Sequence, residues 1–288
     1  MVINLFKSLS DCYVLSNGVK IPCIGFGTWQ APDGDVAAAA VKAAIQAGYR
    51  HIDTAAAYQN EESVGRAIKE CGVPREELFI TTKLNNPVRG YDNTIQAFNE
   101  SMEKLGLDVL DLYLVHWPAP KWTRETWLDA LCESWRAMED LYKAGRIRSI
   151  GVSNFWPHHL DPMLSRVEIA PMVNQIHLCP GDHLEPVIRY TQYKNILIQA
   201  YSPLGHGEIF KNEQMQALAA KYGRSIAQLC IRWSLQLGYL PLPKSVTAAR
   251  IEENGRVFDF EISAEDMAVI SSLTGCCDTA HDPDNTAF

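Results

Sequence analysis

The 288-residue sequence lacks the features that mark membrane-spanning, secreted and nucleic-acid-binding proteins. It contains no run of about 18 apolar residues, and no apolar signal segment with a small-residue cleavage site follows its N-terminus. Its formal net charge is −8, so the overall positive charge typical of nucleic-acid-binding proteins is missing. We therefore expect a cytoplasmic protein that binds neither a membrane nor a nucleic acid.

Cysteine and histidine are present, but not at the spacings of disulfide-rich or metal-binding proteins. None of the eight cysteines forms a C-x-x-C pair, and scattered cysteines in a long chain are typical of reduced thiols. The adjacent His158 and His159 have no further ligand at a metal-binding spacing. We therefore predict no metal site and place both histidines on the surface.

No segment rich in proline, glycine and serine divides the chain, so we predict a single domain over residues 1–288. Near the N-terminus, Asn17-Gly18 separates two short strand-like runs, which predicts a hairpin whose tight turn uses the positive φ angles of this pair. After the hairpin, apolar runs alternate with helical patterns. The runs lie near 24–28, 49–53, 78–82, 110–116, 147–152, 171–175, 196–201 and 239–243. The helical patterns lie near 35–47, 60–71, 93–105, 125–144, 156–165, 183–193, 208–237 and 264–273.

This alternation predicts an α/β fold, a closed (β/α)8 TIM barrel. The stretch 208–237 is expected to hold two helices, because Gly223 fits a helix C-terminus and Ser225 an N-cap. An open dinucleotide-binding sheet is the alternative, and Gly25-Phe-Gly27 resembles its glycine-rich turn. Gln30 stands where the third glycine of that motif belongs, so we favour the barrel.

Four polar side chains follow neighbouring predicted strands. Asp53 ends the second strand with Tyr58 soon after it, Lys83 ends the third, and His116 ends the fourth. Catalytic groups of parallel barrels lie at these C-terminal strand ends. Taken singly, an aspartate after a strand is usually a turn residue, and a lysine or tyrosine in a loop is usually solvated. The four together favour one site.

Such a group suits the reduction of a carbonyl compound. Hydride addition produces an alkoxide that must receive a proton, and the Tyr58 hydroxyl can give one. A phenol with a pKa near ~10 is a reluctant donor, so we expect Lys83 to lower that pKa while Asp53 orients the ammonium. His116 would hydrogen-bond the carbonyl oxygen.

Several long motifs in order resemble those of the aldo-keto reductase family. They are Gly48-Tyr-Arg-His-Ile-Asp53-Thr-Ala with Tyr58-Gln-Asn-Glu, the stretch from Met102 to Pro118, Gly151-Val-Ser-Asn-Phe, Tyr201-Ser-Pro-Leu-Gly, and the stretch from Leu242 to Asn254. The resemblance implies a barrel closed at its bottom by the hairpin, Asp53, Tyr58, Lys83 and His116 as the catalytic tetrad, and NADPH as cofactor. It also implies a monomer.

The same resemblance assigns the cofactor residues. Ser153, Asn154 and Gln175 would hold the nicotinamide carboxamide, and Tyr201 would stack on the ring. Ser202, Leu204 and Gly205 would lie along the pyrophosphate, and Thr28 and Asp53 would also contact the cofactor. Lys244, Ser245, Val246, Thr247 and Arg250 would surround the 2′-phosphate, with Glu253 and Asn254 at the adenine. A lysine, hydroxyls and an arginine within seven residues also suit a phosphate on chemical grounds, which favours NADPH over NADH.

Trp29 and Trp117, with Tyr58 and His116, match substrate-pocket residues of the family. Asn85 stands where many animal members carry tryptophan, and the loops are short. The chain therefore resembles the compact microbial branch, which includes diketogluconate and methylglyoxal reductases and prostaglandin F synthase-like enzymes. We expect an open, shallow and permissive site for small aldehydes and ketones. Two alternatives are a catalytically silent NADP-binding barrel and a phosphate-handling isomerase or aldolase with Lys83 as Schiff-base nucleophile.

Overall fold

The computed structural model describes residues 6–277 and 279–287. The first strands, β1 (Cys12–Val14) and β2 (Lys20–Pro22), form the predicted antiparallel hairpin. Its turn differs from the prediction, because Gly18 has a φ of 85° but Asn17 has no positive φ. The Leu15 N–H donates to the Val19 carbonyl, which closes a three-residue loop instead of a two-residue one. Residues 1–5, part of the segment searched for a signal peptide, lie outside the described residues.

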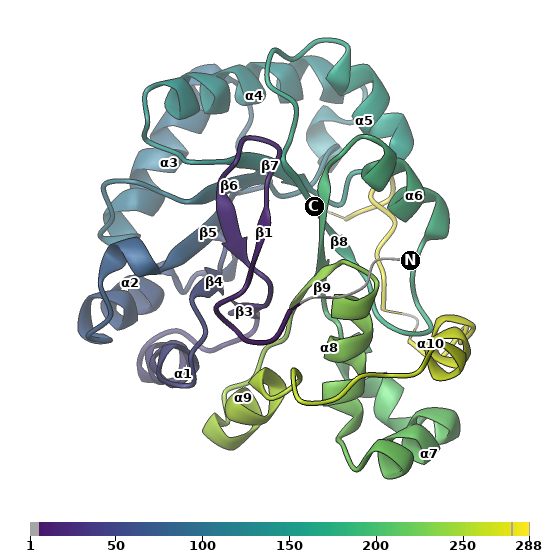
Figure 1. The fold of residues 1–288 in the computed structure, drawn as a ribbon. Coiled ribbons are helices and arrows are strands. Elements are labelled where there is room, and N and C mark those ends of the chain that lie inside the picture. The colour runs from purple at the N-terminus through teal and green to yellow at the C-terminus, as the bar shows by residue number, and fades with distance from the viewer. Residues whose placement is uncertain (1–5, 278, 288) are drawn as a thin grey trace.

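Eight parallel strands follow each other around a nearly closed barrel (Figure 1). The Gly27 N–H donates to the Pro243 carbonyl at 3.0 Å, which links the first barrel strand to the chain just after the last one. All eight predicted strands are present, and the TIM barrel prediction is confirmed. The strands are β3 (Gly25–Gly27), β4 (His51–Asp53), β5 (Phe79–Leu84), β6 (Leu112–Val115), β7 (Ile150–Ser153), β8 (Val173–His177), β9 (Leu197–Tyr201) and β10 (Leu240–Leu242).

Helices surround the strands (Figure 1). The stretch 208–237 holds two helices as predicted: Gly223 adopts a left-handed φ of 61° after the first, and the Ser225 side chain caps the second. One helix that was not predicted, α9 (Ala248–Gly255), follows the last strand. The others are α1 (Asp35–Gln46), α2 (Glu61–Glu70), α3 (Tyr91–Leu105), α4 (Trp127–Lys143), α5 (Pro157–Leu164), α6 (Glu185–Tyr193), α7 (Glu213–Tyr222), α8 (Ile226–Gln236) and α10 (Ala264–Ser271).

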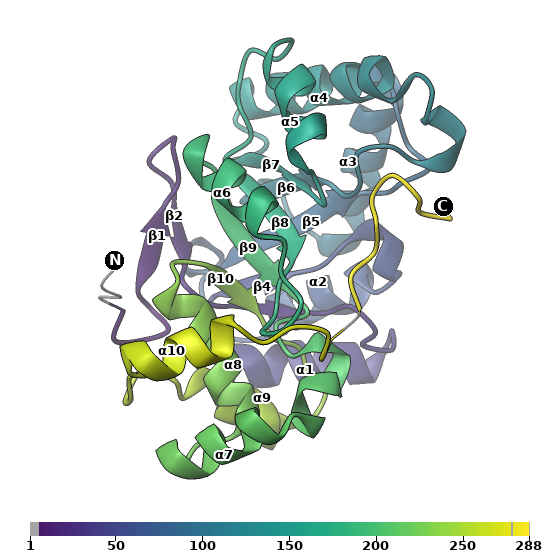
Figure 2. The same cartoon turned by 90° about the vertical axis from the view of Figure 1, so that its right-hand side faces the viewer.

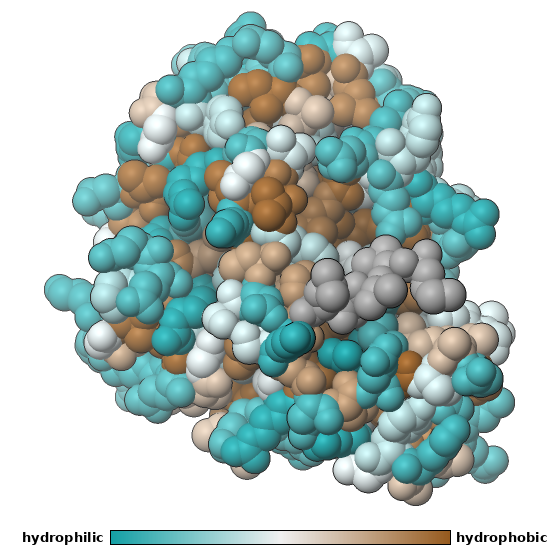
Figure 3. Space-filling model, viewed as in Figure 1, coloured by the Kyte–Doolittle hydropathy of each residue, from teal (hydrophilic) through white to brown (hydrophobic). Residues whose placement is uncertain are grey.

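The hairpin covers the end of the barrel where the strands begin. Tyr13 Oη donates to the Tyr239 carbonyl, just before β10, and Asn17 Nδ2 donates to the Arg148 carbonyl, just before β7. Figure 2 shows the hairpin at one end of the molecule and the chain's C-terminal segment at the other. On the hairpin face, hydrophilic residues dominate the rim and hydrophobic residues form small groups near the centre (Figure 3). Among the described residues, no helix is long and apolar enough to cross a membrane.

The imidazole of His51 is buried where β3 and β4 pair, and its neighbour on β3 must be a glycine. A Cβ added at Gly25 would clash with Leu242 Cδ2 and lie 2.5 Å from His51 Nδ1, so any larger residue would displace these side chains. His51 Nε2 shares a 3.0 Å hydrogen bond with Thr81 Oγ1. Burial, together with the charge of Lys83, lowers the pKa of His51 to about 3, so the folded protein keeps this histidine neutral.

This buried histidine should make stability fall in acid. Between pH 6.5 and about 3 the unfolded chain binds a proton at His51 that the folded chain excludes, so the free energy of unfolding falls as pH falls. His51 alone contributes a slope of about 1.4 kcal/mol per pH unit. In denaturant titrations between pH 7 and 4, His51→Asn should flatten the pH dependence relative to wild type. An unchanged slope would show that His51 titrates normally.

Candidate active site

A cavity of about 780 Å³ opens where the barrel strands end, opposite the hairpin. Its lining comes from residues at the C-terminal ends of nearly all the strands, because parallel strands of a barrel present those ends to one mouth. The site residues predicted from the sequence that line it are Trp29, Asp53, Tyr58, His116, Trp117, Ser153, Asn154, Gln175, Tyr201, Ser202, Leu204 and Lys244.

Lys83 lies beneath the cavity and connects two of its residues. Its side chain on β5 is only 1% exposed. The ammonium donates to Asp53 Oδ1 at 2.6 Å, to the Thr54 carbonyl at 2.9 Å and to Tyr58 Oη at 3.2 Å. These three acceptors match the three protons of an ammonium group, so its position and direction are fixed.

The charges of these groups follow from burial and from the ion pair. Burial by itself lowers the pKa of Lys83, but the charge of Asp53 and the hydrogen bonds outweigh it, so the net pKa is raised and the ammonium stays charged. Burial raises the pKa of Tyr58 above 10, and Lys83 lowers it only in part. The expectation of a net lowered Tyr58 pKa is therefore wrong for this structure, because burial disfavours the phenolate more than Lys83 favours it.

His116, directly after β6, faces Tyr58 across the cavity floor. The two rings are edge to face with centroids 5.7 Å apart. Burial, together with the charges of Lys83 and Arg89, holds the pKa of His116 well below 6.5, so its ring is neutral. Neither ring nitrogen has a hydrogen-bond partner among residues 6–277 and 279–287. The imidazole is therefore free to hydrogen-bond a ligand.

Arg89 supports this part of the wall, and no sequence pattern pointed to it. Its guanidinium is buried, and it donates to the Trp117 carbonyl at 2.6 Å and to the Val88 carbonyl at 2.6 Å. From the other side, Asn154 Nδ2 donates to the His116 carbonyl at 3.0 Å. An arginine in a loop before a helix is usually solvated, so only the folded structure shows this role.

The residues predicted to hold a nicotinamide form one hydrogen-bonded wall. Ser153 Oγ donates to the Gln175 carbonyl at 2.8 Å, and Tyr201 Oη donates to Asn154 Oδ1 at 2.8 Å. Gln175 Nε2 donates to Asp53 Oδ2 at 2.7 Å. This last bond joins the wall to the Asp53–Lys83–Tyr58 group, so the two predicted sets of residues are parts of one site.

The residues predicted for the rest of the cofactor do not all line the cavity. Thr28 is buried and donates to the Asp53 carbonyl. Lys244 lines the cavity and donates to the Gln30 carbonyl at 3.0 Å. From there the chain leads away from the cavity into α9. The residues outside its lining are Thr28, Gly205, Ser245, Val246, Thr247, Arg250, Glu253 and Asn254, of which Thr28, Gly205 and Asn254 are buried.

The outer part of the cavity is lined by predicted residues and by residues that the sequence did not point to. Trp29 is half exposed at its mouth and Trp117 is buried, as substrate-pocket residues can be. The C-terminal tail adds Thr279 and His281 to the wall, and the loops add Trp122, Asn86, Pro87, His206 and Phe210. Sequence reasoning missed these residues because loops without periodicity give no sign of where they pack.

Comparisons with known proteins agree with this geometry. A model of the aldo/keto reductase family matches residues 23–274. The glyoxal reductase of Bacillus subtilis (strain 168) is 47% identical over 98% of this chain and 99% of its own. Methylglyoxal reductase DkgA of Escherichia coli (strain K12) is 41% identical over 94% of this chain and 96% of its own. The crystal structure of an aldo-keto reductase of Bombyx mori in complex with NADP has a TM-score of 0.86 and 35% identity, covering 97% of both chains. This chain belongs to the aldo/keto reductase family.

Proposed function

We propose that this protein reduces small aldehydes and ketones with NADPH, and that Tyr58 donates the proton. As a member of the aldo/keto reductase family, the chain is an NADP-dependent oxidoreductase. The finer assignments, to Tyr58 as acid and to particular substrates, rest on the geometry of the cavity.

The direction of one hydrogen bond carries the proposal. Because Lys83 Nζ donates to Tyr58 Oη, the phenol oxygen acts as acceptor and its own proton is left for another partner. No other hydrogen bond of the Tyr58 hydroxyl occurs within the described residues, and Tyr58 lines the cavity. The raised pKa keeps that proton in place until an acceptor as basic as an alkoxide forms. Lys83 then stabilises the resulting phenolate, and Asp53 keeps Lys83 charged.

His116 is suited to place the carbonyl oxygen of a substrate. Its ring is neutral, faces Tyr58 and has no protein partner among the described residues, so one N–H can donate to that oxygen. A neutral donor orients the oxygen without competing as a stronger acid than Tyr58. Such preorganised donors stabilise charge that develops during reaction.

The residues present fit NADPH. Amide and hydroxyl side chains of Ser153, Asn154 and Gln175 gather at one end of the cavity, beside Tyr201. Lys244 in the cavity wall and the exposed Arg250, outside its lining, form no ion pair with any residue of 6–277 or 279–287. Unpaired cations of this kind suit a phosphate. When bound, NADPH would supply the hydride.

Arg250 provides a direct test of the nucleotide preference. We expect Arg250→Ala to raise the Kd for NADPH by about 10–100-fold, the cost of losing one hydrogen-bonded charge, and to leave the Kd for NADH nearly unchanged. Fluorescence titration with both nucleotides measures this. Arg256→Ala is the matched control, since Arg256 follows the same helix but pairs with Glu252. Equal losses for the two nucleotides would contradict a 2′-phosphate contact.

The names of the relatives suggest substrates to test first. Glyoxal and methylglyoxal are small dicarbonyl compounds, and a cavity of about 780 Å³ exceeds what either needs. We propose that this chain reduces them along with larger aldehydes. The test is loss of NADPH absorbance with a panel of carbonyl compounds, with NADH as the control. No turnover with any compound would favour the silent NADP-binding barrel, and a single substrate would contradict a permissive site.

A further inference from the structure

The C-terminal tail crosses the end of the barrel that carries the cavity. Figure 2 shows it running from α10 along the side opposite the hairpin. His177 Nε2 and Thr279 Oγ1 share a 2.8 Å hydrogen bond, and Asp182 Oδ2 accepts from the N–H groups of Thr279 and Ala280 at 3.1 Å. These contacts anchor the start of the tail. Thr279 and His281 thereby line the cavity.

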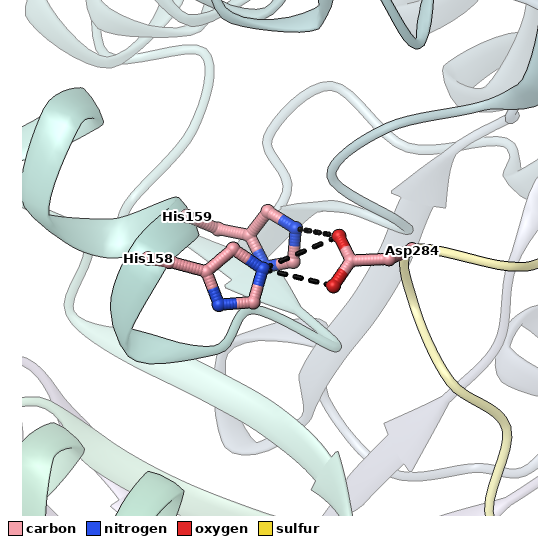
Figure 4. A group of neighbouring side chains, drawn as sticks. All are labelled: His158, His159 and Asp284. Carbon is pink, nitrogen blue, oxygen red and sulfur yellow. Dashed lines mark hydrogen bonds and ion pairs between the residues drawn. The ribbon is translucent and has the colours of Figure 1, made fainter.

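Farther along the tail, Asp284 is held by two histidines of one helix (Figure 4). His158 Nε2 lies 2.9 Å from Asp284 Oδ2, and His159 Nε2 lies 2.9 Å from Oδ1. Beyond this point Arg124 Nη2 donates to the Thr286 carbonyl at 2.8 Å. The tail is therefore fixed on both sides of His281.

His159 is a rigid donor and not the surface residue that the sequence suggested. Its side chain is 1% exposed, whereas that of His158 is 54% exposed. Its ring meets Trp127 edge to face with centroids 5.3 Å apart. The Trp156 N–H donates to His159 Nδ1 at 3.1 Å, so in the neutral ring the proton lies on Nε2 and points to Asp284. Burial lowers the pKa of His159 to about 4, which keeps the ring neutral near pH 7.

The same arrangement argues against a metal ion. The ligand atoms of His158, His159 and Asp284 lie within 4.8 Å of one another, as they would around a metal. A metal would have to bind His159 at Nε2, yet Nδ1 already accepts a backbone N–H. While that hydrogen bond is kept, metal binding at Nε2 would require His159 to lose both ring protons and become an imidazolate, which is costly at neutral pH. A hydrogen-bonded clamp needs no such change.

We propose that His158, His159 and Asp284 form a clamp that positions the C-terminal tail as a wall of the substrate cavity. These are positioning residues that act through His281 and Thr279, and none of them hydrogen-bonds to the Asp53–Lys83–Tyr58 group. The role in substrate binding rests on the proposed reductase function. The clamp should lower KM for small carbonyl substrates and exclude bulky ones, while leaving the proton transfer unchanged.

The test compares Asp284→Ala with wild type by hydrogen exchange and by kinetics. Asp284→Ala should speed amide exchange over residues 279–287, raise KM for methylglyoxal about 10-fold, and change kcat and the NADPH Kd less than twofold. The ratio of kcat/KM for a bulky diaryl diketone to kcat/KM for methylglyoxal should rise. Asp284→Asn keeps one acceptor oxygen, so its amide exchange rate and its KM should lie between those of wild type and Asp284→Ala. Asp161→Asn is the control, because Asp161 is an exposed carboxylate of α5 that pairs with Lys194.

The exchange measurement tests the clamp even if no carbonyl compound is turned over. Failure of the clamp is therefore distinct from failure of the proposed function. Unchanged exchange in Asp284→Ala would overturn the clamp. A fall in kcat at constant KM would also overturn the clamp, since it would show that Asp284 acts in the chemical step. Added zinc should not raise the Tm of the wild type. A zinc-dependent rise that Asp284→Ala abolishes would overturn the clamp in favour of a metal site.

Discussion

Replacing Tyr58 by phenylalanine should lower kcat/KM for carbonyl reduction by about 10²–10⁴-fold, the usual contribution of a positioned acid. The change removes the phenol proton, which is left free for a ligand in the cavity because Lys83 donates to the phenol oxygen. The ring remains, so its edge-to-face contact with His116 is kept. The Kd for NADPH should stay within about twofold, since Tyr58 is not among the proposed nucleotide contacts. Single-turnover kinetics and nucleotide titration measure the two effects.

Tyr113→Phe is the matched control for that experiment. Tyr113 lies on β6, its hydroxyl is fully buried, and it has no hydrogen-bond partner in the described part of the chain. Removing a hydroxyl that makes no hydrogen bond should leave both turnover and stability close to wild type. If Tyr58→Phe retained more than half of the wild-type kcat/KM, the proton would have to come from another group. Borohydride trapping of a substrate on Lys83 would instead favour the Schiff-base alternative.

The barrel could be predicted from the sequence because its strands are covered on both faces. Such strands are nearly continuous apolar runs, and all eight stood out between helical patterns. The helix α9 was missed for two physical reasons. It has only eight residues, and Ile251 is their only large apolar side chain, so the segment shows no apolar period. The turn around Asn17 was also misjudged, because a glycine can close either a two-residue or a three-residue hairpin loop.

The inner part of the site was predictable and the outer part was not. Asp53, Lys83 and His116 lie at or just after the C-terminal ends of strands, so topology alone brings them together. The tail and the loops that add His281 and Trp122 pack by contacts between distant segments, which no local pattern reports. Adjacent helical residues also differ in burial, as His158 and His159 do. The net pKa of Tyr58 depends on the degree of burial, and the sequence contains only the identity of its charged neighbour.

Lys83→Met should reduce both activity and stability, and the two losses can be separated. Without the ammonium, the pKa of Tyr58 rises further because burial is no longer opposed, so the phenol becomes a weaker acid and kcat/KM should fall at least about 100-fold. Asp53 would remain as a buried carboxylate whose only side-chain donor in the described structure is Gln175. Breaking a buried ion pair on one side costs about 3–5 kcal/mol, so the free energy of unfolding at pH 7 should fall by that amount.

The double variant Asp53→Asn/Lys83→Met distinguishes a fold that has lost stability from a site that has lost its chemistry. Asparagine removes the unpaired buried charge and still offers an oxygen to Gln175 Nε2, so denaturant unfolding should recover most of the lost stability. Turnover should not recover, because neither variant restores the cation that Tyr58 Oη accepts from in the wild type. If the double variant regained activity together with stability, Lys83 would be a structural residue only. The hydrogen bond from Lys83 to Tyr58 would then have no part in proton transfer.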